Sequence, residues 1–226
     1  MDNFFLFFAK IFFPYKIFKW MQKFFYYIRS LWICDKFANC SKSVRFGKIG
    51  RIHGPQYISI GKGSFFDDFL FLTAWDTNIS DSKEIFSDGK IEFSSSKNGF
   101  IQHMHPQLTI GDGCSFGAFN HITCTNKIKI GNNVLVGKWV TITDNSHGNT
   151  DINSLKTKPS RRPIVSKGPV IIGNNVWIGD KATILAGVTI GNNAVIGANS
   201  IVTHDIPDFA IAVGNPAKIL KTCAQG

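Results

Sequence analysis

One histidine of this chain stands in a setting that could support acid–base chemistry. His147 ends the segment Thr-Asp-Asn-Ser-His, so that Asp144 and Asn145 come shortly before it. An imidazole titrates near neutral pH and can therefore accept a proton and later return it, and a nearby carboxylate can orient the ring. Taken alone, a histidine in a loop is more often a solvated bystander, and Asp144 is equally consistent with a turn residue.

The chain on both sides of His147 repeats every six residues. Aliphatic side chains recur downstream at this spacing, and four of the six are followed directly by glycine: Ile172, Ile178, Ile184, Ile190, Ile196 and Val202. The same period runs upstream in two registers: Ile110, Phe116, Ile122 and Ile128, then Ile130, Val136 and Ile142. A weaker version extends from Phe46 to Leu72.

A period of six fits neither a helix nor the alternation of a simple strand. It fits a chain that turns a corner every six residues, so that three faces close one triangular coil and each aliphatic side chain points inward. Paired asparagines near the expected corners, such as Asn174–Asn175, tolerate the left-handed backbone that a tight corner needs. We therefore predict an all-β solenoid, a parallel β-helix of triangular cross-section.

Two segments break the period, and one precedes it. Residues 76–100 and 147–169 are expected to be loops that leave the prism, and long loops on a regular scaffold are where sites tend to lie. We expect a helical extension over residues 1–35, the β-helix over 36–222 and a short tail over 223–226.

The N-terminal segment is rich in aromatic and basic residues. After Pro14, which should interrupt any helix, apolar residues fall three and four apart on one helical face while lysines such as Lys19 and Lys23 lie on another. Residues 1–33 are therefore expected either to lie on a membrane surface or to pack on the main domain or a partner subunit. No apolar run is long enough to span a bilayer, and a cleaved signal peptide is not expected.

Charge and cysteine content narrow the protein class. Lysine and arginine exceed aspartate and glutamate by ten (25 − 15), which favours an anionic partner: nucleic acid, a membrane surface or a phosphorylated small molecule. The five cysteines include no Cys-x-x-Cys pair, so we expect reduced thiols rather than a disulfide framework or a zinc ribbon. The expected location is cytoplasmic, with peripheral contact at the inner face of the membrane as a further possibility.

The most regular stretch, from about residue 108 to 221, resembles the hexapeptide-repeat acyltransferases. The segments that carry this resemblance are IGNNVLVGKWVTITDNSHG and, after the loop, GPVIIGNNVWIGDKATILAGVTIGNNAVIGANSIVTHDIPDFAIAVGNPAKILK. Within that family they are most similar to galactoside, maltose and surface-polysaccharide O-acetyltransferases. The resemblance implies a left-handed β-helix, a homotrimer with acetyl-CoA sites between neighbouring prisms, and transfer of acetyl to a hydroxyl of a sugar, in particular of a cell-surface polysaccharide or a lipid-linked glycan precursor.

The resemblance also implies roles for individual residues. It places the catalytic general base at His147, which would deprotonate the attacking hydroxyl, and an oxyanion donor at or next to the Asp180 N–H. The implied acceptor site comprises Asn120, His121, Asp144 and Asn145, although Asn120 could instead be a corner asparagine. The implied acetyl-CoA site comprises Trp177, Gly179, Asp180, Ala198, Thr203, His204 and Lys221. Relatives often carry Lys in place of His204 and Arg in place of Lys221, and Lys lacks the bidentate fork of Arg.

Other interpretations remain open at this point. A hexapeptide-type antibiotic acetyltransferase would share the loop histidine. A γ-type carbonic anhydrase needs three histidines on zinc, and the spacing of His103, His105 and His121 does not reproduce that set, so no metal is expected. A non-catalytic β-helix scaffold would keep the repeat without the loop and His147. No nucleic-acid-binding module is recognisable.

Overall fold

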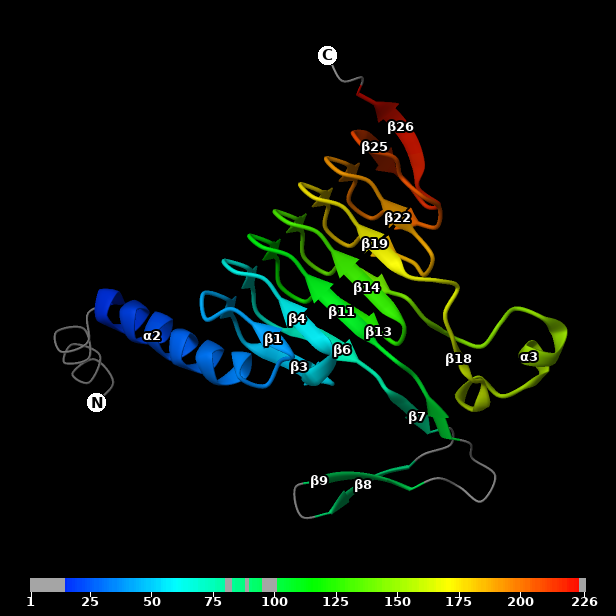
Figure 1. Cartoon of the computed structure of the whole chain (residues 1–226), viewed down its shortest axis with the longest axis horizontal. Helices are drawn as coiled ribbons and strands as arrows, with labels where there is room; N and C mark the ends of the chain where they lie inside the picture. Colours follow the sequence, from blue (N-terminus) through cyan, green and yellow to red (C-terminus); the bar gives the residue numbers. More distant parts are fainter. Residues whose placement is uncertain (1–14, 80–82, 88–89, 95–100, 224–226) are drawn as a thin grey trace, which may run out of the picture.

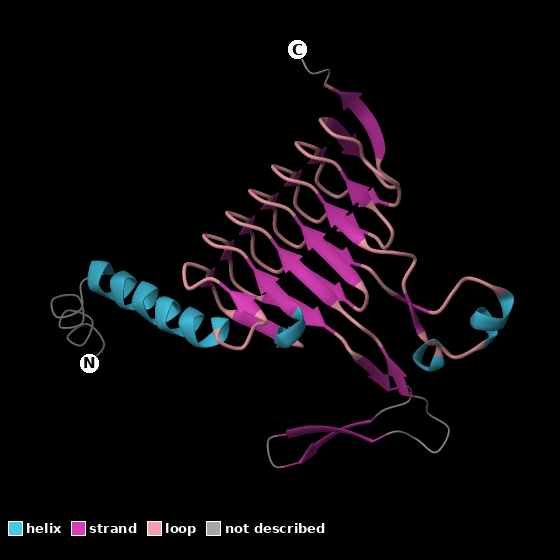
Figure 2. Cartoon of the chain, viewed as in Figure 1, coloured by secondary structure: helices cyan, strands magenta, loops and turns pink. Residues whose placement is uncertain are grey.

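The main body of the protein is a triangular prism of stacked coils. In the computed structural model, which describes residues 15–79, 83–87, 90–94 and 101–223, three sheets of parallel strands form the faces of the prism (Figure 1). The predicted parallel β-helix, with its N-terminal helix and its protruding loop, is confirmed (Figure 2).

Each coil contributes one short strand to each face. The first sheet contains β1 (Asn39–Cys40), β4 (Ile58–Ile60), β11 (Gln107–Ile110), β14 (Lys127–Ile130), β19 (Val170–Ile172) and β22 (Thr189–Ile190). The second contains β2 (Arg45–Phe46), β5 (Phe65–Phe66), β12 (Ser115–Phe116), β15 (Leu135–Val136), β20 (Trp177–Ile178), β23 (Val195–Ile196), β25 (Ala210–Val213) and the antiparallel β26 (Lys218–Thr222). The third contains β3 (Ile49–His53), β6 (Leu70–Ala74), β13 (His121–Cys124), β16 (Thr141–Thr143), β21 (Thr183–Ile184) and β24 (Ile201–Val202).

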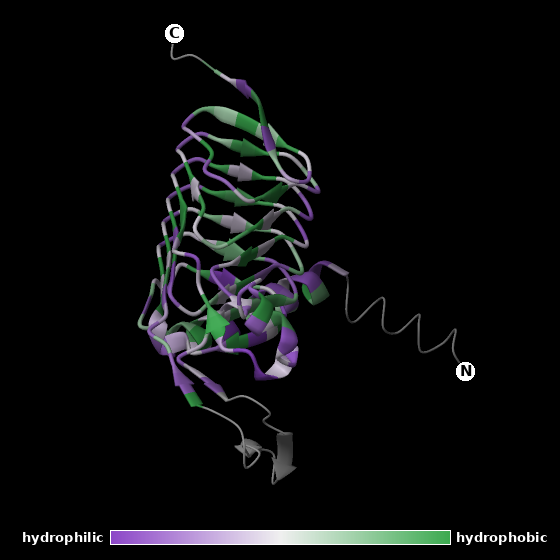
Figure 3. Ribbon diagram, turned by 90° about the vertical axis from the view of Figure 1, so that its right-hand side faces the viewer, coloured by the Kyte–Doolittle hydropathy of each residue, from purple (hydrophilic) through white to green (hydrophobic). Residues whose placement is uncertain are grey.

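The six-residue period corresponds to the inward-facing ladders. All six aliphatic residues from Ile172 to Val202 are at most 1% exposed, as are the upstream members from Ile110 to Ile142. Because each such side chain is worth about 1.5–3 kcal/mol on full burial, the ladders supply the main stabilisation of the prism. Figure 3 shows the hydrophobic strands stacked along the prism, with hydrophilic segments between them.

Asparagines form the corners that join the first sheet to the second. Asn133, Asn175 and Asn193 adopt left-handed backbone with φ of 56–57°, as the paired asparagines predicted. The preceding asparagines bond from coil to coil, since Asn174 Oδ1 accepts from the Asn132 N–H at 2.8 Å. These bonds satisfy backbone donors that the sharp corner would otherwise leave without partners.

Both interruptions leave the prism at the same edge, where the chain passes from the third sheet to the first. We call residues 75–106 the first arm and residues 144–169 the second arm. The first arm contains the antiparallel ribbon of β7 (Thr77–Ile79) and β10 (Ile101–His103) and, beyond it, the hairpin β8 (Lys83–Ser87) and β9 (Lys90–Ser94). The second contains the ribbon of β17 (Ser146–His147) and β18 (Ile164–Val165), α3 (Ile152–Lys156) and the 3₁₀ turn η2 (Pro159–Arg161). A further 3₁₀ turn, η1 (Pro55–Tyr57), precedes β4.

The helix α2 (Tyr15–Cys34) projects from the N-terminal end of the prism (Figure 1). Its C-terminal part is attached: Ser30 Oγ accepts from the Phe46 N–H at 2.9 Å, and the Arg29 guanidinium donates to the Phe46 carbonyl at 3.1 Å. In the described part of α2, only Ser30 and Cys34 are buried. No described helix is long and apolar enough to cross a bilayer.

The expectation that all five thiols are reduced is wrong for one pair. Cys34, at the end of α2, forms a disulfide with Cys40 in β1. The chain turns back between these residues to start the first coil, which brings their Cα atoms to 5.1 Å, a separation that a disulfide can bridge. Cys114, Cys124 and Cys223 are free.

Candidate active site

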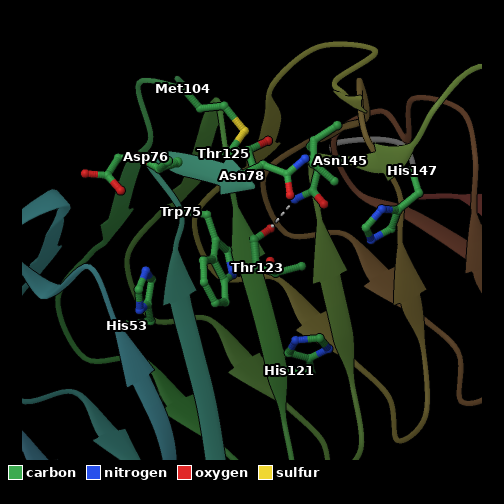
Figure 4. A pocket seen from close by; sticks show the side chains of 12 residues that line it. His53, Trp75, Asp76, Asn78, Met104, His121, Thr123, Thr125, Asn145 and His147 are labelled. Carbon is green, nitrogen blue, oxygen red and sulfur yellow. Dashed lines mark hydrogen bonds between the residues drawn. The ribbon is translucent and has the colours of Figure 1, made fainter. Parts of the chain in front are cut away.

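A cavity of about 520 Å³ lies against the outer face of the third sheet, beside the two arms. The third sheet supplies its floor through His53 of β3 and through His121 and Thr123 of β13, and the arms supply its walls (Figure 4). The lining residues are His53, Trp75, Asp76, Thr77, Asn78, Met104, His121, Thr123, Thr125, Asn145, His147 and Ile164.

His147 lies at one end of this cavity, on the strand where the second arm leaves the prism. It pairs with Ile164 across the antiparallel ribbon, and the Gly148 N–H donates to the Pro163 carbonyl at 2.8 Å just beyond it. His147 is exposed. The ribbon therefore fixes the backbone of His147 while its imidazole stays accessible to a substrate.

A glutamine side chain fastens the two arms together. Gln102 Nε2 donates to the Ile164 carbonyl at 2.7 Å, and Gln102 Oε1 accepts from the Ile164 N–H at 2.8 Å. The amide of Gln102 thus takes the place of a strand neighbour for Ile164, the residue opposite His147. Gln102 carries no signature in the sequence, because residues 62 positions apart come together only in the folded chain.

Asp144 does not orient His147. Its side chain is fully buried and accepts from the N–H groups of Thr125 and Asn126 at 2.9 and 2.8 Å, and from the Thr125 hydroxyl at 3.3 Å. Among the residues that the structure describes, no hydrogen bond joins Asp144 to His147. The prediction of an acceptor contact for Asp144 is therefore corrected to a structural role: it holds the corner between β13 and β14, and with it the pocket residue Thr125.

Asn145 and His121 do line the pocket, whereas Asn120 does not. Asn145 Nδ2 donates to the Thr123 carbonyl at 3.3 Å and to Asp144 Oδ1 at 3.0 Å. Asn120 is fully buried, with Oδ1 accepting from the Val140 N–H and Nδ2 donating to the Gly117 carbonyl, both at 2.8 Å. Asn120 is thus a corner asparagine rather than an acceptor contact, because both ends of its amide are already bonded inside the prism.

His121 projects from the outer face of β13 onto the floor of the cavity (Figure 4). Partial burial lowers the pKa of its imidazole, which favours the neutral form. The Phe71 ring on the preceding coil meets it edge-on, with ring centroids 6.1 Å apart.

The wall opposite His147 consists of residues that sequence analysis missed. The indole of Trp75 stacks on the His53 imidazole with centroids 3.9 Å apart, and the Arg51 guanidinium lies 5.0 Å from the indole centroid. Asp76 Oδ2 accepts from the Tyr57 hydroxyl at 2.8 Å, a bond that raises the pKa of Tyr57. A usable signal was present: Trp75 and Asp76 stand where the period first breaks.

Burial and the nearby Arg51 charge lower the pKa of His53, although Asp76 opposes this shift. His53 is therefore held, like His121, toward the neutral imidazole.

The residues predicted for acetyl-CoA lie on the C-terminal coils, outside this pocket. Gly179, Asp180 and Ala198 meet at the edge between the second and third sheets, where a Cβ on Gly179 would come within 2.6 Å of the Ala198 nitrogen. Trp177 is 54% exposed on the second sheet, and Lys221 is exposed on β26. Thr203 and His204, joined by a 2.8 Å hydrogen bond, lie after β24 at the edge from which the arms leave.

Three further polar side chains do not line the pocket: Arg162, His103 and His105. Arg162 donates to the Thr157 and Leu155 carbonyls at 2.9 and 3.2 Å, so it closes the second arm on itself. Within the described part of the chain, no three His, Cys, Asp or Glu side chains converge as a metal site would require, and His103 and His105 are not among the pocket residues.

The repeat is similar to known bacterial transferases. Residues 169–204 match the family model described as the bacterial transferase hexapeptide (six repeats). The chain is 35% identical over 117 residues to the "Putative lipopolysaccharide biosynthesis O-acetyl transferase" of Escherichia coli K12, covering 50% of this chain and 60% of that protein. It is 40% identical over 99 residues to the galactoside O-acetyltransferase of the same organism, covering 42% and 43%. Each match thus spans less than two thirds of the relative. The resemblance to hexapeptide-repeat acyltransferases is confirmed.

A solved structure shares the fold over most of the chain. An N-acyltransferase from Bacillus cereus, crystallised with dTDP-4-amino-4,6-dideoxyglucose and coenzyme A, superposes with a TM-score of 0.61 at 20% identity, covering 84% of this chain and 87% of that one. At this identity the likeness concerns the fold.

Proposed function

Because this chain carries the hexapeptide repeats of bacterial transferases, we propose that it is an acetyl-CoA-dependent O-acetyltransferase that modifies a hydroxyl of a sugar. The observation that carries the proposal is the position of His147: an accessible imidazole, on a backbone fixed by the β17–β18 ribbon, at one end of a cavity of about 520 Å³. Relatives named as O-acetyltransferases, one of them for lipopolysaccharide biosynthesis, favour a glycan acceptor.

The chemistry follows from the histidine. When bound, acetyl-CoA supplies an activated acyl carbon as a thioester. The imidazole of His147 takes the proton of the acceptor hydroxyl as the hydroxyl oxygen attacks that carbon. The new C–O ester bond forms, the C–S bond breaks, and His147 returns the proton to the departing thiolate. A backbone N–H at or next to Asp180 is the proposed donor to the oxygen that gains negative charge.

The donor site is proposed to lie between two copies of the chain. Gly179, Asp180 and Ala198 cluster at a prism edge different from the one that carries His147. A neighbouring copy could bring its own edge to the pocket, which supports a homotrimer with shared sites. Small residues at Gly179 and Ala198 would leave room for an extended chain such as the pantetheine arm.

The test is thiol release from acetyl-CoA over a panel of sugars and glycans. Wild type should release thiol only when an acceptor is present. His147→Ala should lower kcat/KM by roughly 10³-fold, within the 10²–10⁴ that general-base catalysis provides. His105→Ala is the matched control, since this exposed histidine does not line the pocket. Equal thiol release by wild type and His147→Ala would remove His147 from its role.

We also propose that α2 lies on the inner face of a membrane. Its cationic side chains are Lys16, Lys19, Lys23 and Arg29, and it contains no acidic residue. Trp20 and Phe25 are 65% and 61% exposed, so the helix offers aromatic groups to the headgroup boundary and positive charge to anionic lipid.

Vesicle co-sedimentation tests this location with the full chain. Vesicles containing anionic lipid should bind wild type, and binding should fall by at least tenfold for Lys16→Glu/Lys19→Glu, because each lysine near the surface is worth about 1 kcal/mol. Lys127→Glu/Lys129→Glu makes the same charge change on an exposed face of the prism. Equal loss in both double variants, or no binding by wild type, would contradict a specific role for α2.

A further inference from the structure

The pocket extends well beyond the residue that would do chemistry. Its lining residues follow four successive strands of the third sheet. His53 and Thr123 lie on β3 and β13, whereas Trp75 directly follows β6 and His147 lies on β17, shortly after β16. Three strand spacings of about 4.8 Å give roughly 14 Å from the first of these strands to the last. A hexose ring is about as wide as one such spacing, so the floor is long enough for more than one sugar unit.

At the end of the pocket opposite His147, Trp75 presents an aromatic surface suited to packing against a sugar ring, which we call the sugar platform. Trp75 is half-buried and lines the cavity, and its stack on His53 holds the indole in place (Figure 4). Aromatic rings offer an apolar face to ligands that are polar at their rims. Asp76 and Asn78, beside it, line the cavity and can bond ligand hydroxyls.

The charges around the pocket select against an anionic ligand. No lysine or arginine is among the lining residues that the structure describes, and Arg51 packs on Trp75 instead of lining the cavity. Asp76 is the one carboxylate among these lining residues. Desolvation lowers the pKa values of His53 and His121, which favours the neutral form of both imidazoles. A uronate, sialate or phosphate would therefore meet the Asp76 carboxylate and find no lysine or arginine among the described lining residues to bond it.

We infer that this pocket binds an uncharged glycan of at least two sugar units, with the reacting unit at His147 and the next unit against Trp75. The inference rests on the proposed function and deepens it, because it assigns a chemical class to the acceptor. The excess of lysine and arginine over acidic residues then lies on surfaces outside the pocket, for example on α2.

Binding without acetyl-CoA tests the inference directly. Saturation-transfer NMR is recorded on the full chain with malto-, chito- and galacto-oligosaccharides of one to four units, and with hyaluronan and polysialic acid oligomers as acidic probes. At least one neutral series should bind about tenfold more tightly as a disaccharide than as a monosaccharide, equivalent to about 1.4 kcal/mol. Absence of binding by every neutral series, or tighter binding of an acidic series, overturns the inference.

Variants at Trp75 locate the second unit. Trp75→Ala should weaken disaccharide binding about tenfold and monosaccharide binding little, and Trp75→Phe should restore most of the loss. Trp139→Asn is the matched control: this exposed tryptophan lies outside the pocket at a corner with φ of 61°, a conformation that asparagine tolerates. Near-ultraviolet and far-ultraviolet circular dichroism verify that each variant is folded. Equal affinity of wild type and Trp75→Ala for the disaccharide would refute the platform.

Kinetics separate this inference from the proposed function. With acetyl-CoA, Trp75→Ala should raise KM for the disaccharide about tenfold and leave kcat almost unchanged, because Trp75 is remote from the transferred group. If wild type transfers no acetyl group to any acceptor but binds the disaccharide in a Trp75-dependent way, the proposed function fails and the glycan site stands. If acetyl transfer occurs equally well with monosaccharides and longer chains, the glycan site fails and the proposed function stands.

Discussion

Inside the prism each buried aliphatic residue packs against similar residues in the coils above and below. The contacts between the two arms do not recur from coil to coil. The ladder from Ile172 to Val202 is at most 1% exposed throughout. By contrast, the arms are joined through the two hydrogen bonds between Gln102 and Ile164. The repeated ladders stabilise the prism. The arms, which interrupt the repeat, form the cavity and position His147 in it.

The same residue types behave differently in the two regions. Phe46, Phe66 and Phe116 stack inside the prism with centroids 5.0 and 4.7 Å apart and are at most 1% exposed. Trp75 also stacks, but on the outer face of the third sheet, where it borders the cavity. Whether an aromatic side chain is structural or available to a ligand therefore depends on which side of the strand it occupies.

The largest expected effect on stability comes from opening a ladder. Ile178→Ala removes a fully buried side chain that stands between Val136 and Ile196 in the ladder, and it should lower the free energy of unfolding by about 2–5 kcal/mol. Ile152→Ala, in the second arm, removes the same atoms from a residue that is 70% exposed. This variant should change the free energy of unfolding by less than about 0.5 kcal/mol. Denaturant unfolding measures the free energy of unfolding of both variants. Similar losses would contradict the expectation that the prism, and not the arm, supplies most of the stability.

A smaller effect is expected where the second arm leaves the prism. Asp144→Asn replaces an acceptor-only group by an amide whose NH₂ would face backbone donors, and should cost about 1.5–3 kcal/mol. Asp208→Asn is the control, because Asp208 Oδ1 accepts from the Asn192 N–H at a corner where other coils use asparagine. The free energies of unfolding of the two variants should differ clearly, and equal values would count against the corner role of Asp144.

The contact between the arms should contribute about 1 kcal/mol. Gln102→Ala removes both hydrogen bonds between Gln102 and Ile164. The backbone N–H of Ile164 then loses its acceptor. Hydrogen exchange at the Ile164 amide should become about fivefold faster, while exchange in the ladders stays unchanged. Unaltered exchange at Ile164 would mean that the β17–β18 ribbon holds its position without Gln102.

The smallest effect is expected from pH. The pKa values of His53 and His121 are lowered in the folded chain, so the unfolded chain takes up protons first as the pH falls below about 6.5. Their contribution to stability is therefore complete above that pH and declines as the pH falls toward the folded pKa values. The unfolding midpoint of His53→Gln/His121→Gln should depend less on pH between 7 and 5 than that of wild type. An unchanged slope would contradict this assignment.

Much of the fold was predictable because its signal is local. The six-residue period predicted the ladders, and the asparagine pairs predicted the corners, since both depend on residues next to one another in sequence. His147 was assigned through the resemblance of its flanking motif to the acyltransferases, and the structure places it at the pocket, although its catalytic role stays a prediction.

Residues at the same break were harder to assign. Asp144 and Asn120 have polar side chains that suit a ligand, but hydrogen bonds inside the prism already occupy them. The direction of a side chain at a corner depends on the backbone of that corner, and residue type does not reveal it.

The prism, its ladders and its corners follow from the amino-acid sequence, because each coil repeats interactions that a six-residue pattern encodes. The pocket, in contrast, arises on folding, because the stacking of coils brings together residues from separate parts of the chain: His53, Trp75, His121 and His147. Folding also brings Gln102 to Ile164, 62 residues further along the chain. Contacts between parts of the chain that break the repeat have no periodic signature, and the wall opposite His147 is built from such contacts.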